Sequence, residues 1–410
     1  MRIRVFAIAA LAALAIGVAA CGGSSSSGGS GNKDLTVYSS LPLQGASRVQ
    51  NLAVISGAKL RLSQAGGKVN QFNISYKSLD DSTASAGTWD PGQVSKNART
   101  AASDESTIAY IGEFNSGASA VSIPILNQAG ILTVSPSNTA VGLTTTGPGA
   151  DKGEPAKYYP TGKRTYVRVV PRDTIQGAAL ATLMKQDGCT SLYILNDKSV
   201  YGAGLAKVVE GDAAKQGIKV DGNEGIDPKA SNYRSQAAQI KSSCFMFSGT
   251  TDQNGVQVYK DVAAADPNAK LYGPDGVAEA AFTNPAKGGI PASIAPRVQV
   301  SVATLDPKSY PPAGQKVLSD LAGGSGKLPD PYAIYGYAAM DLVLHSIKAA
   351  GDKGNDRQAV IDEAFKIQNY KSVLGTYSID KNGDTSLTDY GIYTIKNGQL
   401  TFEKAIKAQG

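Results

Sequence analysis

The sequence predicts an α/β protein with two lobes, each built on a doubly wound parallel sheet. Three observations support this fold class. From Leu35 onward, short apolar segments with strand character alternate with longer segments whose apolar residues recur at helical spacing. A stretch rich in glycine, proline and tyrosine, residues 141–164, interrupts this alternation. The chain beyond residue 20 has about 390 residues, which is more than one hydrophobic core usually organises.

Before the interruption, strands and helices alternate regularly. The predicted strands are 35–43, 72–81, 107–114 and 131–137, and the predicted helices are 49–67, 91–103 and 118–130. Helix 49–67 is amphipathic and ends in glycine, and helix 91–103 begins at a proline, which suits the first helical position. Because helices of this length join parallel strands by right-handed crossovers, these elements predict one sheet covered on both faces.

After the interruption the same alternation resumes and predicts a second sheet. The predicted strands are 165–171, 191–197, 219–226, 244–249, 270–276 and 297–306, and the helices between them are 173–188, 202–217, 233–243 and 254–265. The last third is mainly helical, over 332–350 and 357–368. Two final segments, 373–384 and 390–402, close as hairpins at Asn-Gly turns.

The N-terminus predicts export. Residues 1–20 contain two arginines, an apolar run and small residues at the end, which is the pattern of a signal peptide. The small residues before Cys21 resemble the lipobox of bacterial lipoproteins, so Cys21 is the expected lipidation site; an ordinary signal peptide with an incidental Cys21 is the alternative. Residues 21–33 are rich in glycine and serine and predict a flexible tether. We therefore expect an extracytoplasmic protein anchored to the bacterial cell membrane, on the periplasmic side or the outer face.

Charge and cysteine content limit the partners. Removing the signal peptide lowers the net charge from +6 to +4, and the basic residues are scattered, so nucleic acid is not an expected partner. Cys189 and Cys244 each stand at the start of an apolar strand. If these strands are neighbours, a disulfide is geometrically possible in an exported protein, and two free buried thiols are the alternative.

The residues for catalysis are missing. The single histidine, His345, excludes any site that needs two histidines. Lys207 stands where the dinucleotide fingerprint requires its third glycine, and segment 380–384 begins like a calcium loop that lacks the later glycine and glutamate. Asp80 and Asp81 end a strand and are a candidate carboxylate pair, but a solvated or helix-capping role is expected. We predict no enzyme activity, catalytic residue, metal or cofactor.

Polar residues follow two neighbouring strands of the first half. Asn115 and Ser116 come after strand 107–114, and the sequence Ser-Pro-Ser-Asn-Thr ends strand 131–137 at Ser135 to Thr139. In open parallel sheets, ligands bind beyond the carboxyl ends of the strands. Helix N-termini there leave N–H groups unpaired, and with nearby hydroxyls they favour an anion such as a carboxylate.

At this point the sequence resembles the leucine/isoleucine/valine-binding family of type I periplasmic binding proteins, the receptors of ABC amino-acid importers. The stretches that carry the resemblance are IGEFNSGASAVSIPILNQAGILTVSPSNT, YVRVVPRDTIQGAALA, DKSVYGAGLA, LYGPDG, YAIYGYAAMDLV and VLGTYSIDKNGD. They span nearly all of the mature chain in the family's order. The resemblance implies two doubly wound lobes joined by a three-strand hinge.

The resemblance also implies roles for individual residues. Ser116 and Thr139 match positions that bind the ligand's α-carboxylate. The α-ammonium is expected at Thr139, at the backbone near Ser137, and at Asp275 in the turn Gly-Pro-Asp-Gly. Tyr201 matches an aromatic residue that closes over the ligand from the second lobe. The alternatives are simple: helix N-caps at Ser116 and Thr139, a turn residue at Asp275 and a packing role for Tyr201.

The departures from the family pattern concern the ligand's side chain. Two positions that present tyrosines in the family hold Gln50 and one of Thr250 or Thr251 here. Phe114, Asn115 and Asn138 are further expected neighbours of the pocket. Because buried amides without partners cost free energy, this wall predicts an amino acid or related amide that is polar rather than strictly leucine.

The resemblance further implies the domain limits and the biological role. Lobe 1 is expected over 34–150 and 307–372, and lobe 2 over 151–306 and 373–410, with crossings near 141–164, 302–310 and 370–375. The expected function is a monomeric solute-binding protein that delivers its ligand to ABC permease subunits served by cytoplasmic ATPases. The alternative is a sensor that passes lobe closure to a membrane signalling partner.

Overall fold

Two large sheets organise residues 33–323 and 329–408, which are the residues described by the computed structural model. The first sheet has the strand order β2-β3-β1-β4-β5-β6, and every pair in it is parallel except β2 with β3. Its strands are β1 (Asp34–Leu41), β2 (Lys68–Val69), β3 (Phe72–Asp80), β4 (Thr107–Gly112), β5 (Leu132–Ser135) and β6 (Tyr166–Arg168). Long-range contacts place both large sheets in one compact unit, Asn32–Gly410.

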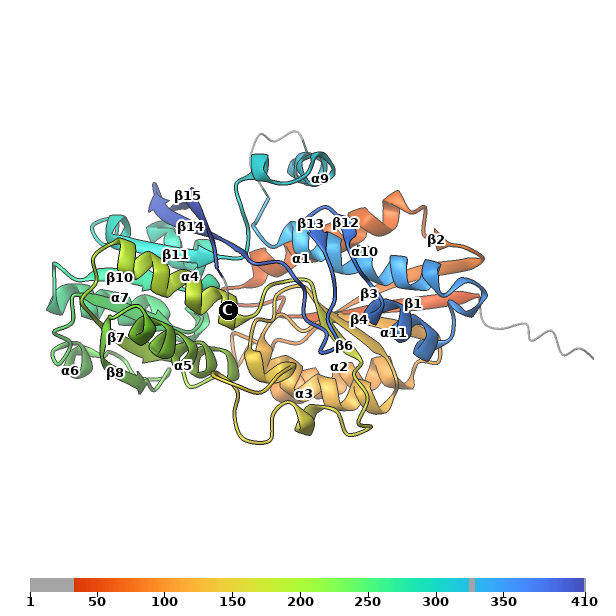
Figure 1. Cartoon of the computed structure of the whole chain (residues 1–410), viewed down its shortest axis with the longest axis horizontal. Helices are drawn as coiled ribbons and strands as arrows, with labels where there is room; N and C mark the ends of the chain where they lie inside the picture. The colour runs from red at the N-terminus through yellow and green to blue at the C-terminus, as the bar shows by residue number, and fades with distance from the viewer. Residues whose placement is uncertain (1–32, 324–328, 409–410) are drawn as a thin grey trace, which may run out of the picture. The chain divides into compact units, whose positions relative to one another are not determined.

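Helices cover both faces of the first sheet (Figure 1). They are α1 (Arg48–Gln64), α2 (Pro91–Ser103), α3 (Ser116–Gln128), α10 (Ala333–Ala349) and α11 (Arg357–Phe365). In Figure 1, α1 and α10 lie above the sheet, and α2 and α3 lie below it. Glycine allows α1 and α10 to pack closely, since a Cβ on Gly57 would lie 2.0 Å from the carbonyl oxygen of Ala333.

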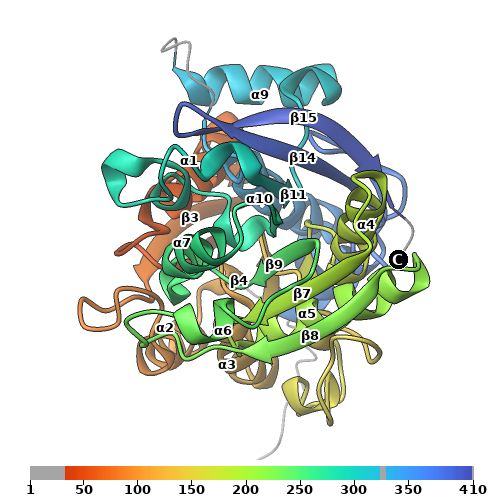
Figure 2. The same ribbon diagram turned by 90° about the vertical axis from the view of Figure 1, so that its left-hand side faces the viewer.

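The second sheet has the order β15-β14-β11-β10-β9-β7-β8 and is parallel up to its antiparallel C-terminal pair. Its strands are β7 (Ser191–Asn196), β8 (Lys219–Gly225), β9 (Cys244–Ser248), β10 (Lys270–Gly273), β11 (Val298–Val302), β14 (Asp389–Lys396) and β15 (Gln399–Lys407). Figure 2 shows α4 (Asp173–Gln186) to the right of this sheet, and α6 (Arg234–Ala237) and α7 (Gly255–Ala265) to the left. Helix α5 (Val200–Lys215) packs against α4 and against β7 and β8. The helix expected over 233–243 is thus confined to α6. The turn between β14 and β15 is Asn397-Gly398, with both residues at positive φ, as predicted for this hairpin.

Cys189 and Cys244 form a disulfide in the structure. The strands β7 and β9 that follow them are direct neighbours, with Leu192 opposite Cys244. This adjacency brings the chain before β7 to the start of β9, where the bridge closes.

Strand β6 corrects the predicted end of lobe 1. We expected lobe 1 to stop at residue 150 and the chain to cross within 141–164. Instead β6 pairs in parallel with β5 of the first sheet. Segment 141–164 has the composition of a linker, but its Tyr158 and Tyr159 are buried against Ile123 of α3, so the segment returns to the sheet that it left. The crossing to the second sheet lies between β6 and α4.

The last crossing also lies later than predicted. We expected it near 370–375, with lobe 2 resuming at residue 373. Strands β12 (Tyr370–Ser372) and β13 (Gly375–Tyr377) instead form a small antiparallel sheet of their own. The turn after them stays with the first lobe, because the Gly383 carbonyl accepts a hydrogen bond from the Arg168 N–H at 2.9 Å. The chain joins the second sheet only at β14. The remaining crossing, expected near 302–310, falls between β11 and α9 (Pro312–Ala322).

A buried cluster of charges fixes the C-terminal turn to the first lobe. Asp384 accepts hydrogen bonds from Arg168 Nε at 2.7 Å and from Arg172 Nη1 at 2.9 Å. Arg168 is fully buried and also donates to the carbonyls of Asn138 and Ala140, at 3.1 and 2.9 Å. The guanidinium therefore ties the C-terminal turn to the loop that follows β5.

Several expectations concern the surface or the undescribed N-terminus. The predicted signal peptide 1–20, the lipidation site Cys21 and the tether up to residue 32 lie outside the described residues. Within the described ranges, no helix is long and apolar enough to cross a membrane.

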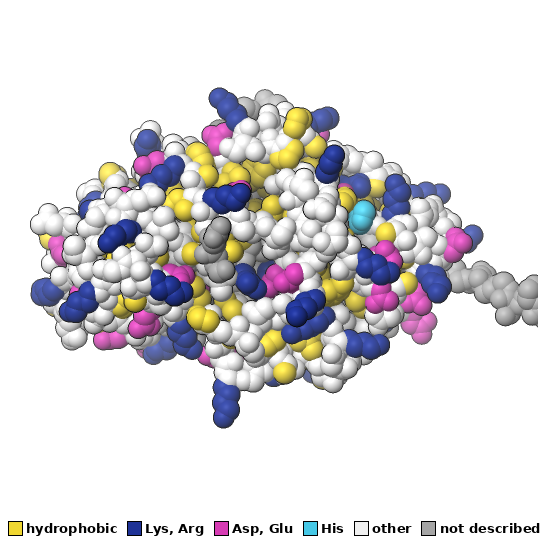
Figure 3. Space-filling view, in the orientation of Figure 1, with side chains coloured by type: hydrophobic (Ala, Val, Ile, Leu, Met, Phe, Trp, Pro, Cys, Tyr) yellow, Lys and Arg dark blue, Asp and Glu magenta, His cyan; other side chains and the backbone are white. Residues whose placement is uncertain are grey.

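On the face that Figure 3 shows, Lys and Arg are interspersed with Asp and Glu. No cluster of three or more His, Cys, Asp or Glu side chains among the described residues is arranged to hold a metal ion.

Candidate ligand-binding site

A cavity of about 240 Å³ is lined by residues that follow strands of both large sheets. In the first sheet these strands are the consecutive strands β3, β1, β4 and β5, and in the second they are the consecutive strands β10, β9 and β7. Nine of the side chains expected near a ligand line this cavity: Gln50, Phe114, Asn115, Ser116, Ser137, Thr139, Tyr201, Thr250 and Asp275. Its volume is below the range of roughly 300–1,000 Å³ that is typical of drug-sized ligands, so it suits a small metabolite.

The start of α3 presents polar groups to the cavity. Asn115 is the N-cap residue, but its side chain makes no capping bond, and its buried Oδ1 has no hydrogen-bond partner in the described part of the chain. Ser116 is the first helical residue rather than a cap, and its Oγ accepts a hydrogen bond from the Ala140 N–H at 3.4 Å. An N-terminus without a side-chain cap keeps free N–H groups and partial positive charge. These groups favour a carboxylate or another small anion.

The polar residues of the loop after β5 have two roles: some line the cavity, and others hold the loop in place. Ser137 and Thr139 line the cavity, and the Ser137 hydroxyl donates to the Phe114 carbonyl at 2.8 Å. Asn138, an expected pocket neighbour, does not line it. Its Nδ2 donates to the same carbonyl at 2.8 Å, and its N–H donates to Ser135 Oγ at 2.9 Å. Asn138 and Ser135 therefore hold the two loops of the first sheet together behind the site.

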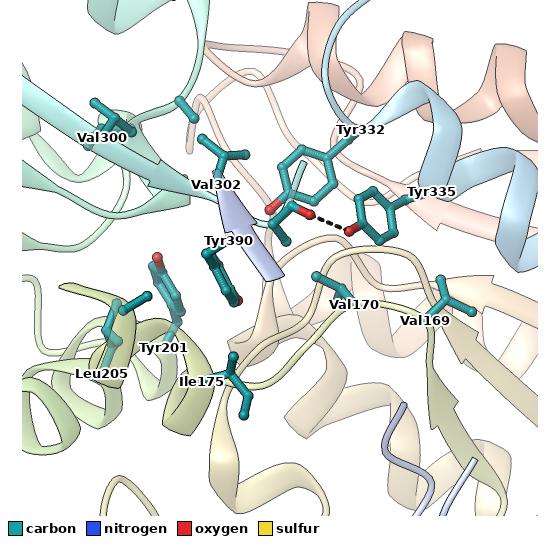
Figure 4. Close-up of a cluster of buried hydrophobic side chains, with 14 of the residues drawn as sticks. Val169, Val170, Ile175, Tyr201, Leu205, Val300, Val302, Tyr332, Tyr335 and Tyr390 are labelled. Atoms are coloured by element: carbon teal, nitrogen blue, oxygen red, sulfur yellow. Dashed lines mark hydrogen bonds between the residues drawn. The ribbon is translucent and has the colours of Figure 1, made fainter. Parts of the chain in front are cut away.

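The second lobe contributes a buried acid. Asp275 follows β10, is 9% exposed, and accepts hydrogen bonds from the hydroxyls of Tyr201 and Tyr332, each at 2.7 Å. Tyr201 lies on α5, and Tyr332 directly precedes α10 of the first lobe. Both side chains belong to the cluster of buried residues in Figure 4. Asp275 thus joins the two lobes at the floor of the cavity.

Three of the predicted residues form the remaining wall. Gln50 on α1 donates to the Ala278 carbonyl at 3.4 Å, which is a second link between the lobes. The sequence did not decide whether Thr250 or Thr251 faces the ligand. Thr250 lines the cavity, whereas the Thr251 hydroxyl donates to the Gly276 carbonyl at 3.5 Å. Phe114 packs edge to face against the Tyr332 ring, with 5.5 Å between the ring centroids.

Trp89, Glu279 and Tyr332 also line the cavity, and the sequence did not predict them. Trp89 is the only tryptophan of the chain and stands just before a predicted helix, which is the one sequence feature that could have marked it as a site residue. Its ring packs on the N-terminus of α3, since a Cβ on Gly117 would lie 2.8 Å from Trp89 Cζ2. Tyr332 begins a stretch that carries the family resemblance, but nothing in its local pattern gives it a role. No pattern marks Glu279.

The cavity is acidic. Asp252, Asp275 and Glu279 line it, and no Lys or Arg is among its described lining residues. Burial raises the pKa of Asp275, while the hydrogen bonds from the two tyrosines act in the opposite direction. Burial and the neighbouring charge of Asp275 raise the pKa of Asp173, at the start of α4, to about 8. The site therefore favours a ligand that brings positive charge to this side.

Comparison with known proteins places the chain in a family. Residues 39–399 match the family model described as periplasmic binding protein. The chain belongs to the periplasmic binding protein family. This family consists of solute-binding proteins, so the protein is a binding protein and not an enzyme.

Individual relatives agree with this assignment. A Leu/Ile/Val-binding protein homolog 1 from Brucella suis is 25% identical over 380 residues, which cover 90% of this chain and 93% of the relative. The crystal structure of a leucine-binding protein from Thermotoga maritima has a TM-score of 0.77 at 20% identity and covers 91% of this chain and 99% of that one. A solute-binding protein of R. palustris in complex with benzoate has a TM-score of 0.74 at 18% identity, with 92% and 97% covered. These likenesses confirm the predicted fold class, two α/β lobes of the type I periplasmic binding protein.

Proposed function

We propose that this protein captures an amino acid in the cavity between its lobes and delivers it to the permease of an ABC importer. The α-carboxylate accepts hydrogen bonds from Ser116, Thr139 and the first N–H groups of α3. The α-ammonium donates to Asp275 and to the backbone near Ser137. Tyr201 holds the Asp275 carboxylate in place and covers the ligand from the second lobe.

The observation that carries the proposal is the pairing of Asp275 with an uncapped helix N-terminus on one cavity. A zwitterionic head group needs both, because its two ends carry opposite charge. The fold alone does not select this ligand, since a benzoate-binding protein shares it. Charge-assisted hydrogen bonds contribute about 1.5–3 kcal/mol each, so three or four support micromolar binding, about 8 kcal/mol, after association costs.

The wall around the ligand's side chain argues for a polar amino acid or a related amide. Gln50, Asn115 and Thr250 present amide and hydroxyl groups to the cavity. An aliphatic side chain would leave these groups without partners, which costs free energy. The names of the relatives include leucine, isoleucine and valine, so branched-chain amino acids belong in the same binding test.

Binding is coupled to the arrangement of the lobes in this proposal. The bonds from Gln50 to Ala278 and from Tyr332 to Asp275 join the lobes on the cavity wall. A ligand held by Ser116 on one side and Asp275 on the other adds further links, so it stabilises the closed arrangement. The permease then recognises lobes with the correct spacing.

Amino-acid binding is tested by thermal unfolding of the mature protein with each of the twenty amino acids and with simple amides. At least one amino acid is expected to raise the Tm, and its deaminated carboxylic acid is expected to raise it less. Trp89 lies in the cavity and is the only tryptophan, so its fluorescence measures the affinity directly. A protein that responds to carboxylic acids but to no amino acid contradicts the proposal, and a response to leucine alone contradicts the polar reading.

Lipid anchoring is a separate part of the proposal, supported by the sequence around Cys21. Stable anchoring takes more than one acyl chain, which a lipoprotein modification of the cysteine supplies. The Cys21→Ala variant is expected in the soluble fraction of host cells, with the unmodified protein in the membrane fraction. Equal membrane association of both would remove Cys21 as the anchor.

Uptake of the labelled ligand by cells that lack the protein tests delivery to a permease.

A further inference from the structure

Glu279 is an acid on the cavity wall that recognition of the amino-acid head group does not use. It is 7% exposed, and its Oε2 has no hydrogen-bond partner among the described residues. It lines the same cavity as Asp275. A buried carboxyl oxygen without a partner is unfavourable, so its position on a ligand cavity suggests that the ligand supplies the missing donor.

Among the described residues, no Lys or Arg lines the cavity beside Glu279. The residue precedes the short helix α8 (Ala280–Thr283) and makes no capping bond to it. The groups that act on its carboxyl are the Thr251 hydroxyl and Asp252, which are neighbours in one turn, and Asp330, which precedes α10. With Asp252 and Asp275, it gives the cavity three carboxyl groups and no Lys or Arg among the described lining residues.

The protonation of Glu279 fits a site that awaits a positive charge. Burial, and then the charges of Asp252 and Asp330, raise its pKa to about 8, while the Thr251 hydroxyl lowers it. At neutral pH without ligand, the carboxyl group is therefore mostly protonated. A cation placed beside it favours the ionised form and releases the proton.

We propose that Glu279 binds a second, cationic nitrogen at the end of the ligand's side chain, so that the preferred ligands are dibasic amino acids such as lysine, ornithine and arginine. This inference rests on the proposed function, which places the head group at Asp275. The Gln50 and Thr250 side chains supply further polar contacts along the wall. The Trp89 ring offers an aromatic face to the methylene groups or to the cation.

The matched ligands for the test are lysine and norleucine, which have the same chain length and differ by the terminal ammonium group. Trp89 fluorescence titrations are expected to show lysine binding at least tenfold more tightly than norleucine. In Glu279→Gln, which keeps the size of the side chain, lysine affinity is expected to fall at least tenfold while norleucine affinity does not fall. Norleucine that binds the unchanged protein as tightly as lysine overturns this inference and leaves the proposed function intact. Failure of every amino acid to bind contradicts the proposed function itself.

A second measurement needs no variant. Calorimetry at pH 7 in two buffers with different ionisation enthalpies counts the protons released on binding. Lysine is expected to release a substantial fraction of one proton more than norleucine, because only lysine ionises Glu279. Equal release by the two ligands would overturn the assignment of the cation to Glu279, even if the Glu279→Gln variant failed to fold.

Discussion

Replacement of Asp275 by asparagine removes a negative charge from the cavity with little change of shape. The carboxylate accepts hydrogen bonds from Tyr201 and Tyr332, each at 2.7 Å, and in the proposal it also meets the α-ammonium. A charge-assisted hydrogen bond contributes about 1.5–3 kcal/mol, and each 1.4 kcal/mol is a factor of ten. Asp275→Asn is therefore expected to weaken amino-acid binding by roughly ten- to a hundredfold.

The same substitution affects folding less, because an asparagine oxygen still accepts one of the two phenol hydrogen bonds. The other buried hydroxyl then loses its acceptor, at a cost of about 1–3 kcal/mol. This cost is offset in part, because the variant no longer buries a charge. Asp275→Ala would leave both phenols without an acceptor and is expected to unfold at a lower temperature than Asp275→Asn.

The assay is isothermal calorimetry with the best amino acid and with its deaminated analogue, together with thermal unfolding of each ligand-free protein. The deaminated acid lacks the ammonium, so its affinity is expected to stay within about twofold in Asp275→Asn. The matched control is Asp352→Asn, an exposed acid in a different part of the chain that accepts a bond from Gln71. Unchanged affinity for the amino acid in a folded Asp275→Asn protein would refute the placement of the ammonium.

Three further predictions concern packing, pH and the disulfide. Gly117→Ala places a Cβ 2.8 Å from Trp89 Cζ2, so the ring must move, and we expect a changed emission maximum and severalfold weaker amino-acid binding. Burial raises the pKa of Asp81 well above its usual value. The contribution of Asp81 to stability is thus fully present below its unfolded pKa of about 4 and is lost as pH rises through the folded pKa. Asp81→Asn removes this contribution, so its stability in urea unfolding should depend less on pH than that of the unchanged protein. Serine at both Cys189 and Cys244 opens a link across 55 residues, and loop entropy predicts a loss of about 4 kcal/mol in the free energy of unfolding.

Each of these has a control or a contrary outcome. Gly211→Ala, where an added Cβ meets no atom within 4 Å, should leave emission and affinity unchanged. Identical emission from Gly117→Ala would show that the ring does not pack on α3. If the urea midpoint of Asp81→Asn changes with pH as much as that of the unchanged protein, the assignment to Asp81 is contradicted. If the double serine variant unfolds with an unchanged free energy, the bridge does not act by restricting the unfolded chain.

Much of the site was accessible from sequence because most of its residues follow strands. An apolar strand that ends in small polar residues is a local pattern, and it pointed to the segments that hold Ser116 and Thr139, which line one cavity. Asp275 came from the family resemblance alone. Trp89 and Glu279 lie further along the segments that follow β3 and β10 than this strand-end pattern reaches.

The lobe boundaries failed for a related reason. A three-residue strand such as β6 carries no information about which sheet it joins. Its place depends on buried contacts made elsewhere, including Tyr158 under α3 and the bond between Arg168 and Asp384, which lie 216 residues apart. The Gly- and Pro-rich composition of 141–164 correctly predicted a loop. It carries no information on which of the two sheets the chain joins after that loop.

The bond between Arg168 and Asp384 connects the turn at residue 384 to the loop that carries Thr139, a residue of the proposed ligand site. The Arg168 guanidinium donates hydrogen bonds to the carbonyls of Asn138 and Ala140, on either side of Thr139, and Asp384 supplies its counter-charge. Without the acid, a fully buried cation loses its counter-charge, at a cost of about 3–5 kcal/mol. We therefore expect substitutions at Asp384 to change solute affinity, although Asp384 does not line the cavity. Attempts to change the specificity of the protein should vary this turn as well as the cavity residues.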